Sequence, residues 1–479
     1  MNTTNSVKLL KTLAPAEFKQ FSKFIRSPYF NTNPYLIKYY DLLKKYYPAF
    51  DSPKLEKQVI FKKLYPDQKF NDTLMRKVNS LMKKHIETFL ALQNLERRSF
   101  LKKYLLADEY GQRNDYGTFE KKINQLLEEV EKNNHKDNHY FLKKFWLHKA
   151  IHSRPETFKN TNQTIHIKEL DKNLNYYFAA TKLKFGSELL NREKILSEDN
   201  KVLFLNDITS QLEKGWGLEH PLLEIYYLTI KLLRSREKDK LFTQLKNKFL
   251  KHINFITASD QQAILLILIN YTMSVYYEGK GHILREQLDL YKNGLAQNLL
   301  VKKERITDQS FLNIVTNAAI LKEFSWLEQF IKKYNQFLEN KNKADILQLC
   351  EAYKNFHQKK YITVNKILQT FLTNDSNLTL RSRFLLIMNQ CELLFEQEDL
   401  YETLEYQISA FEKYIRRNKY LPESRKKQFL HFAKYTKKIA QQKTSIHKPD
   451  WGSLYYEIKK QNELVGKHWL IQKCIVLKR

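Results

Sequence analysis

The chain has 479 residues, with 82 Lys and Arg against 52 Asp and Glu, which gives a formal net charge of +30. Hydrophobic residues make up 42% of it, including 30 Phe and 29 Tyr, which excludes a disordered protein. Only 10 Gly and 10 Pro occur. Because these residues supply the turns of sheets and the loops that hold phosphates, the composition predicts helices joined by short polar turns, and argues against a loop-built active site.

The first hundred residues differ in composition from the rest, because they hold six of the ten prolines and no glycine. We therefore predict a separate four-helix unit over residues 1–98. Its helices are expected to begin at Pro15, at about residue 35, at Pro53 behind the N-cap Ser52 in a helix reaching Tyr65, and at Asn71 or Asp72.

The last two of these helices allow two interpretations. In a helix-turn-helix pair, the second helix would present polar and basic side chains to a nucleic-acid groove, namely Arg76, Lys77, Asn79, Ser80 and Lys83. The turn between them is about six residues long, against the usual three or four. The other interpretation, which we favour, is a cap that covers the exposed core of a helical array.

From residue 99 onward, helices are predicted to follow one another, with repeats only weakly defined over 99–300. The predicted breaks are 111–117, 133–138, 153–162, 197–200, 215–221, 279–281 and 373–377. The stretch between Asp260 and Glu278 lacks charge but contains several amides and hydroxyls. It therefore predicts a helix buried on most sides, and no membrane span is expected.

A two-helix unit recurs within residues 301–479. Each copy has a small or apolar helix, a short polar turn, an aromatic residue and a second apolar helix; the aromatic residues are Trp326, Tyr361 and Tyr401. Ala319 and Ala352 provide small residues for close helix contacts. This pattern resembles the tetratricopeptide repeat (TPR) of about 34 residues, although its usual glycine and terminal proline are missing. The resemblance implies a helical-hairpin solenoid, visible over about 300–420 and weaker over 160–440.

The whole chain also resembles a set of uncharacterised bacterial helical proteins of similar length. The resemblance rests on five short motifs: Phe18-Lys-Gln-Phe21, Ser27-Pro-Tyr-Phe-Asn31, Phe50-Asp-Ser-Pro53, Leu189-Leu-Asn-Arg192 and Tyr414-Ile-Arg-Arg-Asn418. It implies a shared architecture and no particular activity.

Residues 413–443 form the most basic segment, with eleven Lys or Arg and one acid, Glu423. In the helix predicted after Pro422, one face is basic and the opposite face is apolar. The candidate polyanion-binding residues of this segment are Arg416, Arg417, Arg425, Lys426, Lys427, Lys434 and Lys438. The other interpretation, which we favour slightly because the other helices are also rich in lysine, is a solvated face of a late repeat.

No catalytic, cofactor or metal site is predicted. Two His-x-x-x-His pairs, His135 with His139 and His148 with His152, have the spacing for a shared ion, but histidines at the surface or at its boundary with the core are the simpler interpretation. The triplets 215–217 and 279–281 are isolated Gly-x-Gly patterns, which we interpret as helix-to-helix turns that need a positive φ.

The three cysteines, Cys350, Cys391 and Cys474, are far apart and form no Cys-x-x-Cys motif. They predict small buried residues in a reducing compartment. The N-terminus has no apolar stretch typical of a secretion signal, and we expect a cytoplasmic protein.

These observations predict an all-α protein, with a TPR-like solenoid preceded by a small N-terminal helical unit. A closing helix near the C-terminus is expected to cover the end of the stack with Trp469, Leu470, Ile475 and Val476. The expected function is a non-catalytic scaffold for an acidic peptide or protein. The alternative is a basic nucleic-acid-binding protein.

Overall fold

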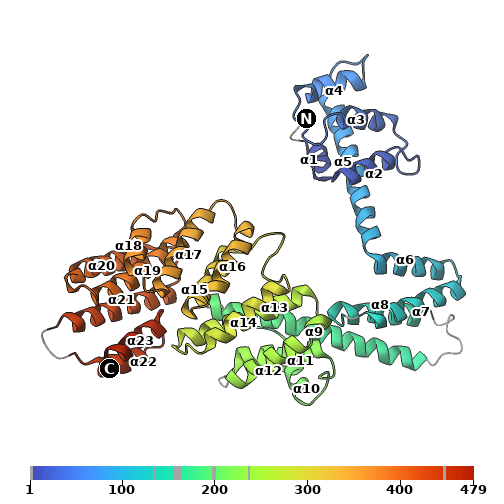
Figure 1. Ribbon diagram of the computed structural model, residues 1–479. Coiled ribbons are helices and arrows are strands. Elements are labelled where there is room, and N and C mark those ends of the chain that lie inside the picture. Colours follow the sequence, from blue (N-terminus) through green and yellow to red (C-terminus); the bar gives the residue numbers. More distant parts are fainter. Residues whose placement is uncertain are drawn as a thin grey trace. The chain divides into compact units, whose positions relative to one another are not determined.

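The protein is all-α, as the sequence predicts (Figure 1). The computed structural model describes residues 4–133, 135–154, 163–196, 201–235, 238–445 and 449–478. Within these ranges there is no β-strand, and a single isolated antiparallel bridge pairs Lys302 with Arg305. Two of the predicted breaks fall on residues outside these ranges: most of the break at 153–162, and all of the break at 197–200.

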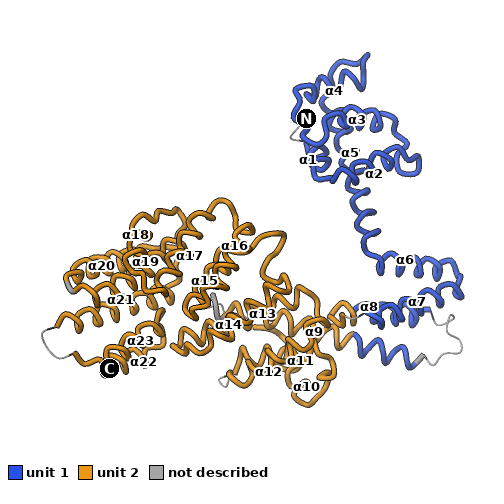
Figure 2. Tube along the Cα trace, viewed as in Figure 1, with its two compact units in different colours: residues 1–133, 142–173 blue, residues 134–141, 174–479 orange. Residues whose placement is uncertain are grey.

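The chain divides into two compact units (Figure 2). The first contains Met1–Asn133 and Leu142–Asn173, and the second contains Asn134–Phe141 and Leu174–Arg479. The predicted segment boundaries after residues 98 and 300 therefore differ from the division between the units. Helices α8 and α9 each contribute residues to both units.

The helices of the first unit are α1 (Asn5–Thr12), α2 (Pro15–Phe24), α3 (Pro34–Lys44), α4 (Lys57–Leu64), α5 (Asp72–Arg97), α6 (Ser99–Gln112) and α7 (Tyr116–Lys132), with parts of α8 (Asn138–His152) and α9 (Gln163–Leu196). Helices α1 to α4 all contact α5, and together they bury one core that includes Phe21, Tyr39, Phe61 and Met82. Pro15 and Pro34 occupy the first turns of α2 and α3, where the missing N–H is not needed.

The predicted helix over 53–65 is wrong in its first part. Ser52 does cap a turn, since its side chain accepts from the Lys54 N–H, but that turn is the short 3-10 helix η1 (Pro53–Leu55). Glu56 then adopts an extended conformation with ψ of 144°, which ends η1 before α4 begins. Asn71 is the N-cap of α5, and its side chain accepts from the Leu74 N–H at 3.0 Å.

The second unit continues with helices packed on their chain neighbours. These are α10 (Leu205–Glu213), α11 (Pro221–Arg234), α12 (Lys238–Lys251), α13 (Ala258–Tyr277), α14 (Ile283–Ala296), α15 (Asp308–Ile320), α16 (Phe324–Tyr334), α17 (Lys343–His357), α18 (Tyr361–Gln369), α19 (Ser376–Leu394), α20 (Tyr401–Arg417), α21 (Glu423–Thr444), α22 (Trp451–Lys460) and α23 (Lys467–Lys478). Short 3-10 helices follow α12 (η3, Ile253–Phe255) and α16 (η4, Asn335–Phe337) and precede α20 (η5, Glu398–Leu400).

The three predicted helix pairs of the C-terminal part are confirmed. Helix α15 packs on α16, α17 on α18, and α19 on α20, and the expected aromatic residues Tyr361 and Tyr401 are the first residues of α18 and α20. Helices α15, α17, α19 and α21 form a row in which each contacts the next. We call this row the inner row, because the cavity described below opens on it.

A common turn joins several of these helices. In the described part of the chain, six helix ends share one geometry. One residue has a positive φ and its N–H donates to the carbonyl three residues before it, while the N–H of the next residue donates to the carbonyl five residues before that residue. The six positive-φ residues are Asn114, Gly215, Gly279, Asn298, Lys322 and Lys359. This is the Schellman pattern, which satisfies the last helical carbonyls. Only two of the six are glycines, so lysine and asparagine accept a conformation that L-residues rarely adopt.

Helix α13 corresponds to the long uncharged stretch of the sequence. Its Ile264, Leu265, Leu268 and Val275 are buried, as predicted, while Leu266 remains 39% exposed. No helix in the described part of the chain combines the length and the apolar character that a membrane span requires.

Candidate functional site

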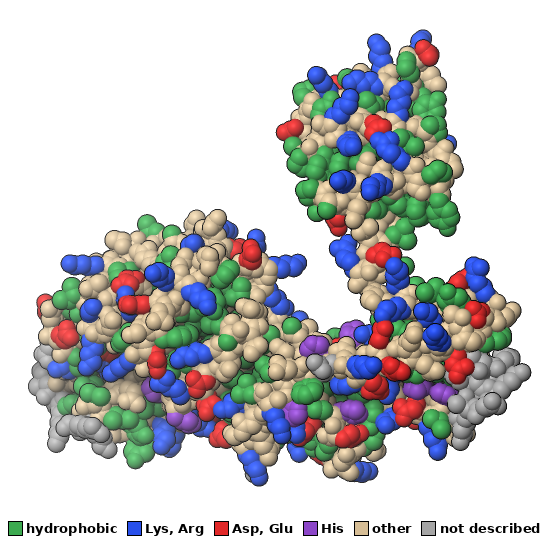
Figure 3. Space-filling model, turned by 45° about the vertical axis from the view of Figure 1, so that its right-hand side comes forward, with side chains coloured by type: hydrophobic (Ala, Val, Ile, Leu, Met, Phe, Trp, Pro, Cys, Tyr) green, Lys and Arg blue, Asp and Glu red, His purple; other side chains and the backbone are tan. Residues whose placement is uncertain are grey.

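The seven candidate polyanion-binding residues lie on α20 and α21, but the structure divides them into three groups. Lys and Arg are also scattered over both units elsewhere, with Asp and Glu among them (Figure 3). Arg416 and Arg417 form the last turn of α20, where cations interact favourably with the helix dipole, and both are exposed. Lys427 and Lys434 are exposed on α21. None of these four lies within ion-pair distance of a carboxylate among the described residues.

Lys426 and Lys438 are paired within the chain. Lys426 Nζ lies 2.7 Å from Glu423 Oε1, and Lys438 Nζ lies 2.7 Å from each carboxylate oxygen of Glu457 on α22. The hydrogen bond from Lys438 is the largest cause that lowers the pKa of Glu457. The predicted basic face is therefore interrupted where α22 supplies a carboxylate.

The opposite face of α21 is buried, as predicted. Phe429, Phe432, Ala433, Ile439 and Ala440 are all buried. Their burial fixes the rotation of α21 about its axis, and thereby decides which of its basic side chains reach solvent.

Arg425 points away from the predicted basic face and lines a cavity of about 350 Å³ in the second unit. The cavity lies against the inner row and is also lined by residues of α13, α14 and α23. The Arg425 guanidinium lies over the rings of Tyr277 and Phe429, 5.5 Å from each centroid, and donates to Gln428 Oε1 at 2.9 Å.

Arg381, on α19, is the second cation in the cavity wall. Its Nη2 donates to Asn313 Oδ1 on α15 at 2.7 Å. Among the described residues, no Asp or Glu lines the cavity. Two histidines do, and both favour the neutral form: burial, with a smaller contribution from Lys322, lowers the pKa of His357 to about 4, and burial lowers the pKa of His468.

Helix α23, near the end of the chain, forms one wall of the cavity. Helix α23 contacts α13, α21 and α22, and Trp469 donates its indole N–H to Glu392 Oε1 on α19 at 2.9 Å. Lys473 forms an ion pair with the same carboxylate. The predicted closing helix is thus present with Leu470 buried, but it lies against α13 and α21, and Val476 is 66% exposed.

The two glycines of the triplet 279–281 lie beside α23, and each is needed for a different reason. Gly279 has a φ of +92°, as predicted for a turn glycine. Gly281 does not need a positive φ; a Cβ there would lie 2.1 Å from His468 Nε2 of α23. In the triplet 215–217, both glycines have a positive φ, as expected.

In the first unit, the residues expected to face a nucleic-acid groove are partly engaged. Asn79 accepts hydrogen bonds from Ser6 on α1 and Tyr39 on α3, at 2.9 Å and 2.7 Å. Arg76 forms an ion pair with Asp72, and Lys83 one with Glu87. The Asn79 amide is therefore used inside the fold, which disfavours the helix-turn-helix interpretation and fits a structural role for α5.

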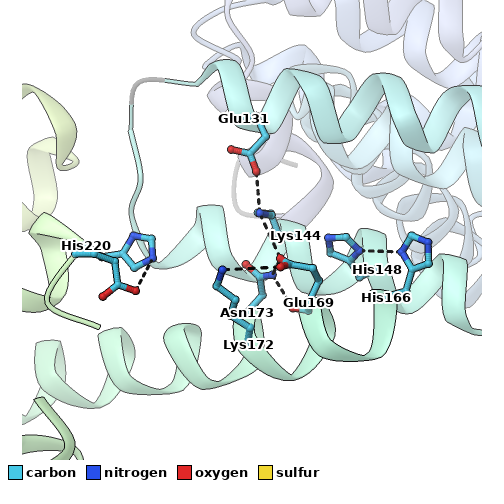
Figure 4. Close-up of polar contacts among 9 residues, drawn as sticks. Glu131, Lys144, His148, His166, Glu169, Lys172, Asn173 and His220 are labelled. Carbon is cyan, nitrogen blue, oxygen red and sulfur yellow. Dashed lines mark hydrogen bonds and ion pairs between the residues drawn. The ribbon is translucent and has the colours of Figure 1, made fainter. Parts of the chain in front are cut away.

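A polar cluster joins α7, α8 and the start of α9 in the same unit (Figure 4). Lys144 lies 2.7 Å from Glu131 and 3.8 Å from Glu169. The Nδ1 atoms of His148 and His166 are 3.3 Å apart. Burial lowers the pKa of His148 to about 4, with a smaller contribution from the positive charge of Lys144. This imidazole is therefore neutral at pH 7.

The predicted His-x-x-x-His pairs are not the pairs that meet. His148 faces His166, eighteen residues on, and His135 precedes α8 while His139 lies on it. Over the described ranges, no group of three or more His, Cys, Asp or Glu is placed to hold a metal ion. The cysteines are free and buried, as expected.

Comparison with known proteins gives no relative. No family model matches the chain, and neither a curated protein nor a solved structure matches it significantly.

The sequence did not reveal the cavity, because its residues come from seven helices between α13 and α23. The sequence pattern shows only that Arg381 and Arg383, two apart on one helix, cannot share a face. The structure shows that Arg381 lines the cavity, while Arg383 is exposed and lies over the Tyr414 ring.

Proposed function

We propose that this protein is a non-catalytic scaffold, a TPR-like helical solenoid that binds an acidic segment of a partner protein. The observation that carries the proposal is a group of exposed cations at the end of α20 and on α21 that form no ion pair with a carboxylate among the described residues, namely Arg416, Arg417, Lys427 and Lys434. Exposed cations of this kind attract acidic partners and accelerate association.

An acidic protein fits this surface better than a nucleic acid. A phosphate backbone is best bound by many cations and by arginine, whose fork matches phosphate oxygens. Here the unpaired group is small, and the chain as a whole holds 65 Lys against 17 Arg. The internal hydrogen bonds of Asn79 also remove one polar residue from the alternative interface on α5.

Binding of three fluorescent probes tests the proposal: a glutamate-rich peptide, a random DNA duplex and a random single strand, each titrated at several salt concentrations. We expect the peptide to bind more tightly than either nucleic acid. Tighter binding of a nucleic acid, with a steep loss of affinity as salt rises, would support the alternative function.

The structure supplies a matched pair of variants for this assay. Reversing Lys427 and Lys434 to Glu is expected to weaken peptide binding by about tenfold, or about 1.4 kcal/mol. Replacing both Lys438 and its partner Glu457 with Gln removes two charges that already cancel, and is expected to leave peptide affinity unchanged. Equal losses from both changes would contradict the assignment of the unpaired lysines.

A cytoplasmic location remains part of the proposal. It is supported by three free, buried cysteines, which are typical of a reducing compartment.

A further inference from the structure

The cavity beside the inner row combines apolar walls with two cations that lack a counter-charge. Arg381 and Arg425 both line it, no carboxylate does, and neither guanidinium is within ion-pair distance of a carboxylate among the described residues. Both arginines are half-buried. A partly desolvated cation without a partner is unfavourable, so the cavity presents a site for an anion.

The hydrogen bonds of the two arginines leave donors for a ligand. Arg381 donates to Asn313 Oδ1 and is hydrogen-bonded to the Tyr353 hydroxyl, and Arg425 donates to Gln428 Oε1. Each guanidinium has five N–H donors in a rigid fork that matches a carboxylate. The remaining contacts of Arg425 are with the ring faces of Tyr277 and Phe429, which hold it in place without neutralising it.

Other charges near the cavity do not fill this role. Glu392 does not line the cavity and is already engaged by Lys473 and the Trp469 indole. The histidines His357 and His468 favour the neutral form, because burial lowers the pKa of each. The charge that faces the cavity at pH 7 is therefore positive.

The rest of the wall is suited to an apolar body. Phe384, Phe429, Trp469, Met273, Met388 and Leu380 all line the cavity. Its volume of about 350 Å³ is at the lower end of the range for small-molecule sites, which are mostly apolar with a few placed polar groups. An extended peptide is too large for such a space.

We propose that this cavity binds a small monocarboxylic acid, with its carboxylate on Arg381 and Arg425 and its apolar body between the aromatic walls. The site is distinct from the exposed cations that carry the proposed scaffold function, and it stands without them. Because α23 forms part of the wall, the bound acid would also join α19 and α21 to the C-terminal helix.

A titration of the full-length protein with apolar acids tests the proposal. The probes are phenylpropionate, hexanoate and isovalerate, with phenylpropionamide and phenylpropanol as uncharged analogues and acetate and inorganic phosphate as anions without an apolar body. Calorimetry is expected to show one site for at least one apolar acid with a Kd below about 1 mM, and at least tenfold weaker binding of its uncharged analogue. Tight binding of phosphate alone would overturn the apolar-body requirement.

Two variants and one control make the result specific. Arg381→Gln and Arg425→Gln are each expected to weaken acid binding by at least about tenfold. Arg383→Gln, on the exposed face of the same helix as Arg381, is expected to leave it unchanged. Circular dichroism confirms that each variant is folded. The proposal is overturned if no apolar acid binds, if the amide binds as well as the acid, or if both folded cavity variants retain the wild-type affinity.

Discussion

Replacing Lys184 with Met should destabilise the second unit, because it removes the cation from a buried carboxylate. Asp260, at the start of α13, is only 2% exposed. Its carboxylate accepts hydrogen bonds from Tyr226 at 2.5 Å and Thr257 at 2.6 Å, and lies 2.8 Å from Lys184 Nζ on α9. Met preserves most of the apolar stem of Lys184 and removes only the charge and the donor.

The magnitude follows from the burial of the two partners. A hydrogen bond to a charged group contributes about 1.5–3 kcal/mol, and breaking a fully buried ion pair costs about 3–5 kcal/mol. Lys184 is 24% exposed, so the pair is not fully buried and the expected loss of stability lies in the upper part of the first range, at about 2–3 kcal/mol. The hydroxyl groups of Tyr226 and Thr257 still donate to the Asp260 carboxylate, which keeps the loss of stability below the roughly 3–5 kcal/mol of a fully buried pair.

The loss should also depend on pH. Burial raises the pKa of Asp260, but the hydrogen bonds from Lys184, Thr257 and Tyr226 outweigh it and hold the pKa below its ordinary value. The network therefore stabilises the fold above the unfolded pKa of about 3.9, and this contribution disappears as the pH falls through the folded pKa. Without Lys184, burial dominates and the carboxyl can take up a proton, so the deficit of the variant should shrink between pH 7 and pH 4.

Urea unfolding followed by tryptophan fluorescence measures this effect, since Trp216, Trp326, Trp451 and Trp469 all belong to the second unit. Lys182→Met is the control, because Lys182 has no carboxylate within ion-pair distance among the described residues and makes only cation–π contacts near 5.9 Å. Its loss should stay near 0.5 kcal/mol, as for about one exposed cation–π contact. The reasoning would be refuted if Lys184→Met lowered the free energy of unfolding by as little as the control, or by an amount that does not change with pH.

Two further predictions concern a helix end and a buried histidine. Lys359→Gly should stabilise the second unit by about 0.5–1 kcal/mol in urea unfolding, because Lys359 has a φ of +63°, which glycine adopts without strain. Lys360→Gly, where φ is negative, is the control and should destabilise the unit. A stabilising Lys360→Gly together with a destabilising Lys359→Gly would contradict the strain at this turn. Between pH 6.5 and pH 4, His148 takes up a proton in the unfolded chain but stays neutral in the folded protein. Its contribution therefore lowers the free energy of unfolding by up to about 1.4 kcal/mol for each pH unit of acidification. His148→Gln should remove this contribution and leave that of His357, whose pKa burial also lowers to about 4; an unchanged slope in thermal unfolding at stepped pH would contradict the prediction.

The elements that the sequence predicted correctly depend on local patterns. Asn71 caps α5 through the N–H three residues on, and the aromatic residues at 361 and 401 begin the second helices of their pairs. Such features need only neighbours within about a turn of helix. The break at Glu56 was missed because helical propensity continues through it, and the turns at Lys322 and Lys359 were not recognised as Schellman ends because lysine stands where glycine is usual.

The fate of each cation, in contrast, is decided by residues far along the chain. Lys438 meets Glu457 across a helix connection, Arg381 meets Asn313 from 68 residues away, and Lys473 meets Glu392 from 81 residues away. A count of charges in residues 413–443 does not distinguish Arg425 from Lys427. In the structure, the packing of α21 places Arg425 in the wall of the cavity, whereas Lys427 is exposed to solvent.

This separation means that two different anions can be sought on the same helix. A peptide that binds the exposed lysines of α21 has access to solvent and should lose affinity steeply with salt, since exposed charges are screened within about 10 Å at 0.1 M. A small acid held by Arg381 and Arg425 is screened much less, because the charges are half-buried between aromatic rings. Salt dependence alone therefore distinguishes the two sites, and a cavity ligand released as readily by salt as the peptide would place both anions on the outer surface.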